Sequence, residues 1–518
     1  MSEMHFVALP DGVNEKEFAA AIAEFKAAIG ADNVVVSPEL IAPYAKIMIP
    51  VDENRHMPAG ALMPKTVEEV QQIMAICNKY KVPVWPISTG RNFGYGSAAP
   101  ARRGTLVLDL RRMNNIIEVD ADLGFALVEA GVTYQQLADY LEAHNLPLWL
   151  DTPMPAPVAS PTGNTLDRGV GYTPYGEHFM FQCGMEVVLA NGKVLRTGMG
   201  ALENSNTWQV FKWGYGPYLD GIFTQSNYGV VTKMGFWLMP KPPVYKPFLV
   251  KYPKEEDIVT AIDTIRPLRM NQIIANAGTV SNALWEIAVT HKRADLWDGE
   301  GQLPDDIINR VAKEKGYGAW NVYAALYGTQ EQVEVNWKMV KGAFEASGGE
   351  VLVEENMAPD DPLWQYRKDM MSGTLSMLEF GLYNWRGGGG STWFAPVSQA
   401  KGSETLKQMS MAKRITREYG IDYVALFIIG WRDMHHIVDL LYDRTNPKEM
   451  QGAHGCYRKL LQEFAGQGYG VYRANTAFMD EVAALYGDVK HEVNQTLKAA
   501  LDPNGIIAPG KSGIDIIR

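Results

Sequence analysis

The hydrophobic positions of the first 240 residues follow two spacings, one typical of helices and the other of strands. An apolar residue recurs at helical intervals up to Gly30, which predicts an amphipathic helix that ends at this glycine. Short apolar runs alternate with helical stretches in the rest of this half, and we expect an α+β domain with a mixed sheet. The helical positions are Phe18, Ile22, Phe25 and Ile29, the expected strands cover 60–63, 82–87, 105–110, 116–120 and 125–129, and a further helix covers about 134–143.

A second helix carries apolar residues on one face between the strands at 60–63 and 82–87, so these three elements are expected to form a βαβ unit. Thr66 and Glu69 have the spacing of a capping box at its start.

The clearest domain boundary lies at Pro240, because closely spaced prolines interrupt both helices and strand pairing. We therefore divide the chain into a first domain at 1–240, a second domain at 241–480, and a C-terminal segment at 481–518. The glycines and prolines of this last segment predict that it packs back on the first domain. In the second domain, the apolar run 424–429 has the length of a buried strand.

The composition narrows the classes of function. The chain is 47% hydrophobic and 21% charged, which is ordinary for a globular protein. Its 59 acidic residues exceed its 48 basic ones, and the net charge of -11 argues against nucleic acid or an anionic membrane as the main partner. No apolar stretch approaches the ~18 residues of a membrane span, and no basic segment followed by an apolar one opens the chain, so we expect a cytoplasmic protein. Three separated cysteines exclude a disulfide scaffold or a cysteine-based metal cluster.

The loop at 88–92 follows an apolar strand and can present consecutive backbone N–H groups, with Gly90 allowing a tight turn, as a diphosphate requires. It is neither a Walker loop nor the Rossmann G-x-G-x-x-G motif. Further glycine-rich loops at 161–165, 168–171 and 227–231 indicate a large, flat ligand that several loops approach closely.

Five long stretches, in the same order, resemble the vanillyl-alcohol oxidase / p-cresol methylhydroxylase family of flavoenzymes, over about residues 10–514. The resemblance implies an α+β, two-domain fold in which a discontinuous FAD-binding domain is built from the N-terminal half and the C-terminal tail, with an α+β substrate cap domain between them. The stretches are PISTGRNFGYGSAAP (86–100), TGNTLDRGVGYTPYGEHF (162–179), FTQSNYGVVTKMGF (223–236), EFGLYNWRGGGG (379–390) and DPNGIIAPGKSGI (502–514).

The resemblance also implies which residues bind FAD. Tyr383 matches the tyrosine to which part of this family attaches its flavin, so we expect a covalent 8α-O-tyrosyl bond at that residue. By analogy, Lys511 is expected near the flavin pyrimidine. Ser88, Thr89, Gly90, Arg91 and Asn92 are expected at the pyrophosphate, Gly163, Asn164, Thr165 and Gly169 at the isoalloxazine and ribityl chain, and Gly229 and Val231 at the adenosine half.

Tyr95, Tyr472 and Arg473 match the family's phenol-binding residues. Binding a phenol as its phenolate at neutral pH costs about 4 kcal/mol, because its pKa lies near 10. Two hydroxyl donors and a guanidinium, each contributing roughly 1.5–3 kcal/mol to a buried anion, offset that cost. A phenolate can then expel hydride from its para α-carbon and become a p-quinone methide.

Two carboxylates are candidates for the base that activates water toward the quinone methide, and the sequence leaves the choice open. Asp151 matches the active-site aspartate of the oxidases in the family, and Glu379 matches a glutamate of the hydroxylases. Leu426 stands where relatives carry Glu or Gln, which predicts a more apolar pocket with room for a longer alkyl chain.

These matches predict an FAD-dependent oxidation of 4-alkylphenols at the α-carbon, followed by water addition or desaturation, in a homodimer. O2 is the expected acceptor, with hydrogen peroxide as its product, and a c-type cytochrome is the alternative. A flavin-binding protein without catalytic activity and a carbohydrate or lactate oxidase are the competing classes, but neither would need the phenol-binding residues. No metal is expected at Asp433, His435 and His436, because adjacent histidines point apart on a helix or a strand.

Overall fold

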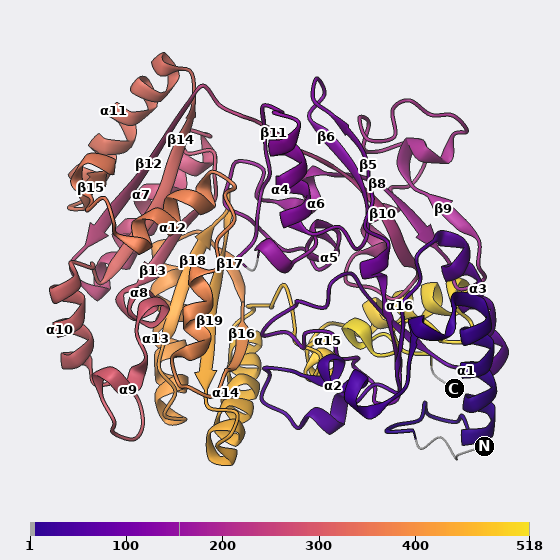
Figure 1. Ribbon diagram of the computed structural model, residues 1–518. Helices are drawn as coiled ribbons and strands as arrows, with labels where there is room; N and C mark the ends of the chain where they lie inside the picture. Colours follow the sequence, from indigo (N-terminus) through magenta and orange to yellow (C-terminus); the bar gives the residue numbers. More distant parts are fainter. Residues whose placement is uncertain (1–5, 155, 517–518) are drawn as a thin grey trace.

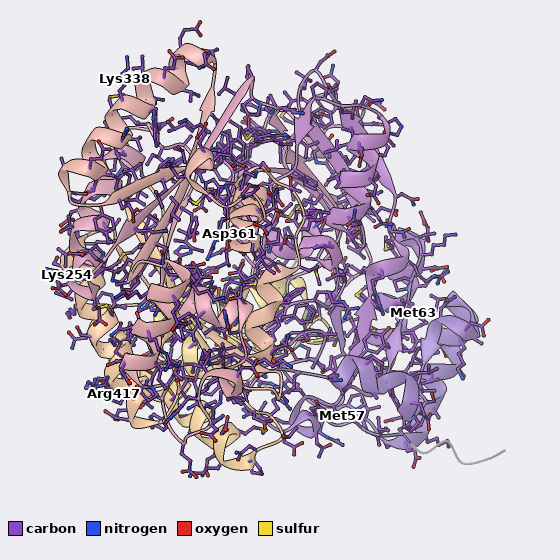
Figure 2. All side chains as sticks on the ribbon, turned by 60° about the vertical axis from the view of Figure 1, so that its left-hand side comes forward. Met57, Met63, Lys254, Lys338, Asp361 and Arg417 are labelled. Carbon is purple, nitrogen blue, oxygen red and sulfur yellow. The ribbon has the colours of Figure 1, made fainter. Side chains whose placement is uncertain are left out.

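The computed structural model describes residues 6–154 and 156–516, and its elements form two halves that lie side by side (Figure 1). One half contains two small sheets and a separate two-stranded pair, all built from the N-terminal residues, and the C-terminal residues return to it. The other half is built on one large sheet. Exposed Lys254, Lys338 and Arg417 lie along the outline of this second half, whereas Met57 and Met63 belong to the first (Figure 2).

The first small sheet carries the predicted βαβ unit. Strands β2 and β3 both pair in parallel with β4, which lies between them, and β1 joins β2 in the antiparallel sense. A parallel pair needs a crossover connection, and α3 supplies it. The bounds are β1 (Val34–Val35), β2 (Ala61–Leu62), α3 (Val67–Tyr80), β3 (Val84–Ile87) and β4 (Leu106–Asp109).

Helices α1 (Glu15–Ile29) and α3 cover this sheet, and the predicted helix that ends at Gly30 is confirmed. Its apolar face is buried as the spacing predicts. At the start of α3, Thr66 accepts a hydrogen bond from the Glu69 N–H at 3.2 Å. The Glu69 carboxylate accepts the N–H of Lys65 rather than that of Thr66, so only half of the predicted capping box forms.

A second small sheet follows, so the predicted strands divide between two sheets: those at 60–63, 82–87 and 105–110 belong to the mixed sheet, and those at 116–120 and 125–129 belong to an antiparallel one. The short turn between β5 and β6 makes them an antiparallel hairpin, and β10, β8 and β9 extend it in the antiparallel sense. Its order is β5 (Ile116–Asp120), β6 (Phe125–Glu129), β10 (Val230–Trp237), β8 (Gln182–Val188) and β9 (Val194–Arg196), and the separate pair β7 (Leu148–Trp149) and β11 (Met239–Pro240) lies beside it.

The large sheet is antiparallel throughout and is buried on both faces. Along β18 (Val424–Ile429), alternate side chains enter two different cores, which explains why its apolar run is continuous. In order, its strands are β15 (Glu350–Val353), β12 (Val244–Tyr252), β14 (Trp320–Gly328), β13 (Gly278–Asn282), β18, β19 (Asp433–Tyr442) and β16 (Gly390–Phe394), with β17 (Val397–Gln399) also paired to β19.

Different helices cover the two faces of the large sheet. The face that carries Ala425 and Phe427 packs against α7 (Ile258–Met270), α11 (Gln330–Ala346), α13 (Gly402–Glu418) and α14 (Pro447–Gly466). The face that carries Leu426 packs against α8 (Ala283–Thr290), α10 (Asp305–Lys315) and α12 (Pro362–Met371). The remaining helices are α2 (Pro38–Ala45), α4 (Tyr134–Ala143), α5 (Pro161–Leu166), α6 (His178–Phe181), α9 (Arg293–Leu296), α15 (Met479–Ala483) and α16 (Asp488–Leu501).

The C-terminal residues pack on the first small sheet. The N–H of Val84 donates to the carbonyl of Ile506 at 2.8 Å, and the N–H of Ala508 donates to the carbonyl of Val84 at 2.7 Å. This contact brings Lys511 to the end of β3. Within the described residues, no helix is long and apolar enough to cross a membrane.

Candidate active site

One cavity is lined by both halves of the molecule and by the C-terminal segment. The side of the large sheet that carries Leu426 forms one wall, and the loop after β3 forms another. Most of the residues predicted from the sequence line it. These are Ser88, Thr89, Gly90, Arg91, Asn92, Tyr95, Gly163, Asn164, Gly229, Val231, Glu379, Tyr383, Tyr472, Arg473 and Lys511.

The loop 88–92 contains the tight turn that the sequence predicts at Gly90. It leaves β3 with Gly90 at φ +68°, in the left-handed region, and a Cβ there would lie 2.9 Å from that of Ala98. The hydroxyl of Thr162, which also lines the cavity, is buried without a hydrogen-bond partner in the described part of the chain. A cavity lined by a tight glycine loop and by a buried hydroxyl that is unpaired among the described residues fits FAD, whose pyrophosphate and ribityl oxygens accept hydrogen bonds.

Three predicted residues, Asp151, Thr165 and Gly169, do not line the cavity. The carboxylate of Asp151 is already occupied: Oδ1 lies 2.7 Å from His178 Nε2, and Oδ2 accepts the Thr173 N–H at 2.7 Å as well as the Thr173 hydroxyl. His178 contacts Asn164 through its other ring nitrogen, at 2.5 Å. Asp151 therefore reaches the cavity only indirectly, through His178 and Asn164.

Gly169 is a glycine because of a protein contact. A Cβ at this position would lie 2.1 Å from the Asn164 Oδ1 atom. The small residue thus lets the chain pass close to Asn164, which does line the cavity.

The three predicted phenol-binding residues lie together. The Arg473 guanidinium lies 4.3 Å from the centre of the Tyr95 ring and 5.9 Å from that of Tyr472. The Tyr95 hydroxyl is buried and makes no hydrogen bond with any described residue. Burial raises the pKa of Tyr95 well above its ordinary value, so this hydroxyl is a proton donor.

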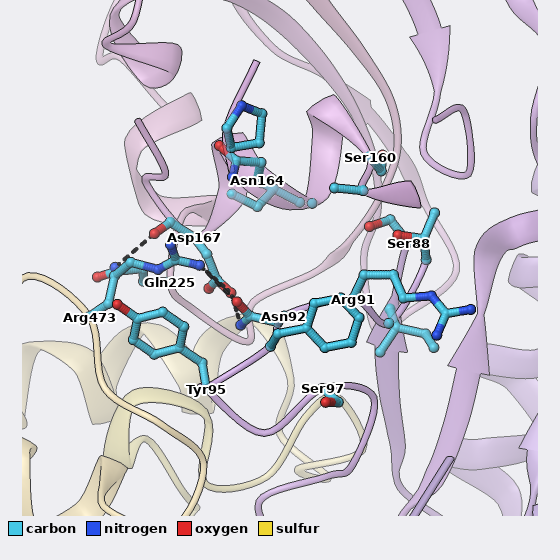
Figure 3. Close-up of a pocket in the computed structure, with 18 of the residues that line it drawn as sticks. Ser88, Arg91, Asn92, Tyr95, Ser97, Ser160, Asn164, Asp167, Gln225 and Arg473 are labelled. Carbon is cyan, nitrogen blue, oxygen red and sulfur yellow. Dashed lines mark hydrogen bonds and ion pairs between the residues drawn. The ribbon is translucent and has the colours of Figure 1, made fainter. Parts of the chain in front are cut away.

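Arg473 keeps its positive charge although it is buried. Burial alone would lower its pKa, but the neighbouring Tyr95, Tyr472 and Asp167 outweigh that effect and raise it. Its guanidinium donates to Asn92 Oδ1 at 2.8 Å (Figure 3). The side chain of Asn92 is thus engaged by Arg473, whereas Arg91 extends away from this contact.

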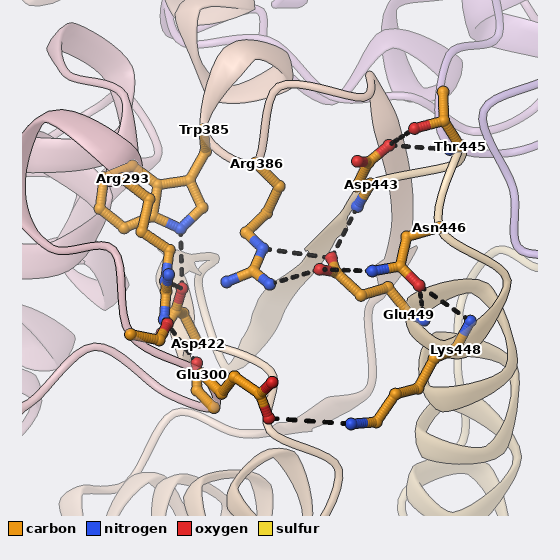
Figure 4. A network of polar contacts seen from close by, with 12 residues as sticks. Arg293, Glu300, Trp385, Arg386, Asp422, Asp443, Thr445, Asn446, Lys448 and Glu449 are labelled. Atoms are coloured by element: carbon orange, nitrogen blue, oxygen red, sulfur yellow. Dashed lines mark hydrogen bonds and ion pairs between the residues drawn. The ribbon is translucent and has the colours of Figure 1, made fainter.

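Glu379 and Tyr383 lie on one 3₁₀ segment, η9 (Leu378–Asn384). Two interactions directly after it fix its position: the Trp385 indole N–H donates to Asp422 at 2.9 Å, and Arg386 forms an ion pair with Glu449 at 2.7 Å (Figure 4). The segment therefore presents both residues to the cavity from a fixed support.

The Glu379 carboxylate is buried, and neither of its oxygens has a hydrogen-bond partner among the described residues. Burial, together with the charges of Glu286 and Asp439, raises the pKa of Glu379 well above the ordinary value of a glutamate. The ring of Tyr383 stacks on Phe380 with 5.5 Å between centroids and meets Phe93 edge to face at 6.2 Å. Burial likewise raises the pKa of Tyr383.

Two residues at or near the cavity were missed by the sequence analysis, Trp393 in its lining and Asp439 close to Tyr383. Asp439 is fully buried on β19, where it accepts a hydrogen bond from Ser391 at 2.7 Å, and burial raises its pKa to about 8. Trp393 lines the cavity and donates its indole N–H to the same Ser391 at 3.0 Å. The available signal for Asp439 was a carboxylate among the apolar residues of 437–441. Nothing in the local pattern separates Trp393 from a core residue.

His435 and His436 point to opposite faces of β19. His435 stacks on Tyr472 at 4.4 Å between ring centroids, and His436 stacks on Phe427 at 4.3 Å. The two rings therefore cannot bind one metal ion together, and His435 instead packs against Tyr472, one of the residues predicted to bind a phenol.

Family comparisons agree with a two-part flavoprotein. Residues 58–198 match a family described as an FAD binding domain, and residues 308–512 match the C-terminal domain of FAD linked oxidases.

Relatives that match over their full length identify the family more specifically than these domain matches do. The 4-cresol dehydrogenase (hydroxylating) flavoprotein subunit of Pseudomonas putida is 56% identical over all of this chain and 99% of its own length. A crystal structure of p-cresol methylhydroxylase with substrate bound superposes with a TM-score of 0.97, covering 98% of this chain and 99% of the other. A 4-ethylphenol oxidase from Gulosibacter chungangensis is 37% identical, with a TM-score of 0.96 and the same coverage. This chain therefore belongs to the vanillyl-alcohol oxidase / p-cresol methylhydroxylase family of flavoproteins.

Proposed function

We propose that this protein oxidises 4-alkylphenols at the α-carbon with the help of FAD. The observation that carries the proposal is the buried Tyr95 hydroxyl, unpaired among the described residues, on the ring over which the Arg473 guanidinium lies at 4.3 Å. A free donor beside a fixed positive charge suits an oxygen anion, and a phenolate is the anion that both relatives' substrates can form.

The binding energy for the phenolate comes from these same residues. Ionising a phenol at neutral pH costs about 4 kcal/mol, and charge-assisted hydrogen bonds of about 1.5–3 kcal/mol each can offset it in a site without water. The aromatic side chains of Tyr172, Trp285 and Trp393 line the cavity and exclude water from the ring of the substrate. Leu426 is buried on the same wall, which favours an alkyl chain longer than methyl.

FAD, when bound, supplies the acceptor for the hydride that leaves the α-carbon. The loop 88–92 would hold its pyrophosphate, and Gly163 and Asn164 would lie along its ring and ribityl chain. We propose that Tyr383 carries it through an 8α-O-tyrosyl bond, because this tyrosine lines the cavity on a well-supported segment.

Loss of hydride from a bound phenolate leaves a p-quinone methide, and its fate depends on a base. We assign that role to Glu379 rather than Asp151. Glu379 lines the cavity with both oxygens unpaired within the described ranges, whereas His178 and Thr173 occupy the oxygens of Asp151. Its raised pKa makes the ionised Glu379 a stronger base toward water than an exposed glutamate. Without attack by water, loss of a β-proton gives the alkenylphenol.

Two acceptors can reoxidise the flavin, O2 or a c-type cytochrome, and we propose the same half-reaction for either. The greater identity to a relative named as a dehydrogenase than to one named as an oxidase favours the cytochrome. The family resemblance supports a homodimer as the assembly.

With 4-ethylphenol as substrate, we expect added cytochrome c to be reduced faster than peroxide is formed. Spectrophotometry of the cytochrome and a peroxidase-coupled assay measure the two rates on the same enzyme sample. Hydrogen peroxide formed mole for mole with product, with no effect of cytochrome, would instead assign O2 as the acceptor. Absence of product with either acceptor would contradict the proposed function itself.

A further inference from the structure

The charge of Arg473 is part of a buried cluster that also contains Asp167 and Lys511. Asp167 Oδ1 lies 2.7 Å from Lys511 Nζ, and its Oδ2 lies 3.9 Å from the Arg473 guanidinium. All three side chains are less than one fifth exposed. The Asn92 amide connects them: its Nδ2 donates to Asp167 Oδ2 at 2.8 Å, and its Oδ1 accepts from Arg473 at 2.8 Å (Figure 3).

The cluster joins distant parts of the chain. Asp167 follows α5, Asn92 follows β3, and Lys511 begins the C-terminal η10 (Lys511–Gly513). Gln225 adds two more contacts, because its side chain donates to the backbone carbonyls of Asp167 and Tyr472. Among the described residues, the charged groups that face the Asp167 carboxylate are Lys511 and Arg473, since the adjacent Arg168 turns to the Thr224 hydroxyl.

Asp167 remains ionised in this setting. Burial on its own would raise its pKa, but Lys511 and Arg473 outweigh burial, and the pKa lies below the ordinary value of an aspartate. Two cations and one anion therefore leave a single positive charge at the place where a phenolate would bind. Without Asp167 there would be two positive charges, and without Lys511 there would be none.

We infer that Asp167 and Lys511 act as a positioning pair that sets how strongly Arg473 attracts the phenolate. Asp167 holds the Arg473 guanidinium in place through Asn92, and its negative charge weakens the attraction of Arg473 for the substrate anion. The positive charge of Lys511 partly neutralises Asp167 and so reduces this weakening. The pair thus determines the pH range over which phenols are bound in ionised form. This inference rests on the proposed function, since it concerns the same phenolate.

The test uses the oxidised holoenzyme and 4-nitrophenol, a phenol that has no α-hydrogen to lose and whose anion and neutral form absorb differently. Difference spectra at a pH one unit below the pKa of the ligand report both affinity and ionisation. We expect Asp167→Asn to bind the anion about tenfold more tightly and Lys511→Gln about tenfold more weakly, because each variant removes one charge from the cluster that contains Arg473. The double variant should return to within about twofold of the wild type.

Recovery of the wild-type affinity in the double variant distinguishes an effect of charge from a loss of structure. If both single variants weaken binding and the double variant binds no better, the inference is overturned, and it is equally overturned if Asp167→Asn changes nothing. As a matched control, 4-nitroanisole, which cannot ionise, should keep its affinity in all variants. If Asp167→Asn does not fold, Lys511→Gln alone still tests the inference. Anion binding as tight in Lys511→Gln as in the wild type would contradict the role inferred for Asp167 and Lys511.

A failure of the proposed function would look different. In that case the wild type would bind 4-nitrophenol in its neutral form, and Arg473→Gln would bind it equally well. Failure of the present inference alone would leave the anion bound and sensitive to Arg473→Gln, but insensitive to Asp167 and Lys511.

Discussion

Arg473→Gln is expected to slow reduction of the bound flavin by 4-ethylphenol about a thousandfold. Without the guanidinium, the substrate binds as the neutral phenol, and the free energy of ionising it, about 4 kcal/mol, adds to the barrier for hydride loss. Because the remaining reaction needs phenolate from solution, the rate in this variant should rise with pH toward the pKa of the phenol. Anaerobic stopped-flow absorbance measures the rate directly.

Arg473→Lys is the matched control for charge. It keeps a cation beside Tyr95 but lacks the planar group that also donates to Asn92, so we expect a smaller loss than with glutamine. Equal rates for the wild type and Arg473→Gln would mean that the substrate is not bound as an anion at this residue.

Tyr383→Phe is expected to release essentially all flavin into the supernatant on acid precipitation, whereas the wild type keeps its flavin in the pellet. The phenylalanine preserves the stacking on Phe380 but has no oxygen to form the 8α bond. Flavin reduction should also slow in this variant, because the electron-withdrawing ether link is lost. The absorbance of the supernatant, compared with that of the unfolded pellet, measures the released fraction.

A second tyrosine serves as the control. Tyr423 is buried, forms a hydrogen bond of 2.8 Å with His436, and does not line the cavity. The Tyr423→Phe variant should therefore retain its flavin through acid precipitation. If the wild type itself releases its flavin, the covalent assignment of Tyr383 is wrong.

Local periodicity predicted most elements of the first half because the apolar residues of each helix recur at helical spacing and those of each strand form a short continuous run. The helix before Gly30 and the strand in 125–129 have nearly the bounds that their apolar residues indicate. The division into two small sheets was not predictable in this way. Strand pairing depends on partners far apart in sequence, and β6 pairs with β10, more than a hundred residues later.

The site was predictable where its residues lie in continuous stretches that resemble the family, as at 88–92 and at Tyr472 and Arg473. It was not predictable where function depends on a contact between stretches. Nothing around Asp167 in the sequence indicates that Lys511 reaches it from 344 positions away. For Asp151 the resemblance identified the residue, but it did not show its contacts. His178 and Thr173 form hydrogen bonds with its two carboxylate oxygens, and these contacts became visible only in the structure.

The central claim is that ionisation of the substrate phenol allows hydride to leave its side chain. Anaerobic mixing of the oxidised enzyme with 4-ethylphenol and, in parallel, with 4-ethylanisole tests it most directly, since the two compounds differ in the ability to lose that proton. We predict that the flavin absorbance bleaches with 4-ethylphenol and stays unchanged with 4-ethylanisole. Bleaching at similar rates with both compounds, or with neither, would contradict the claim.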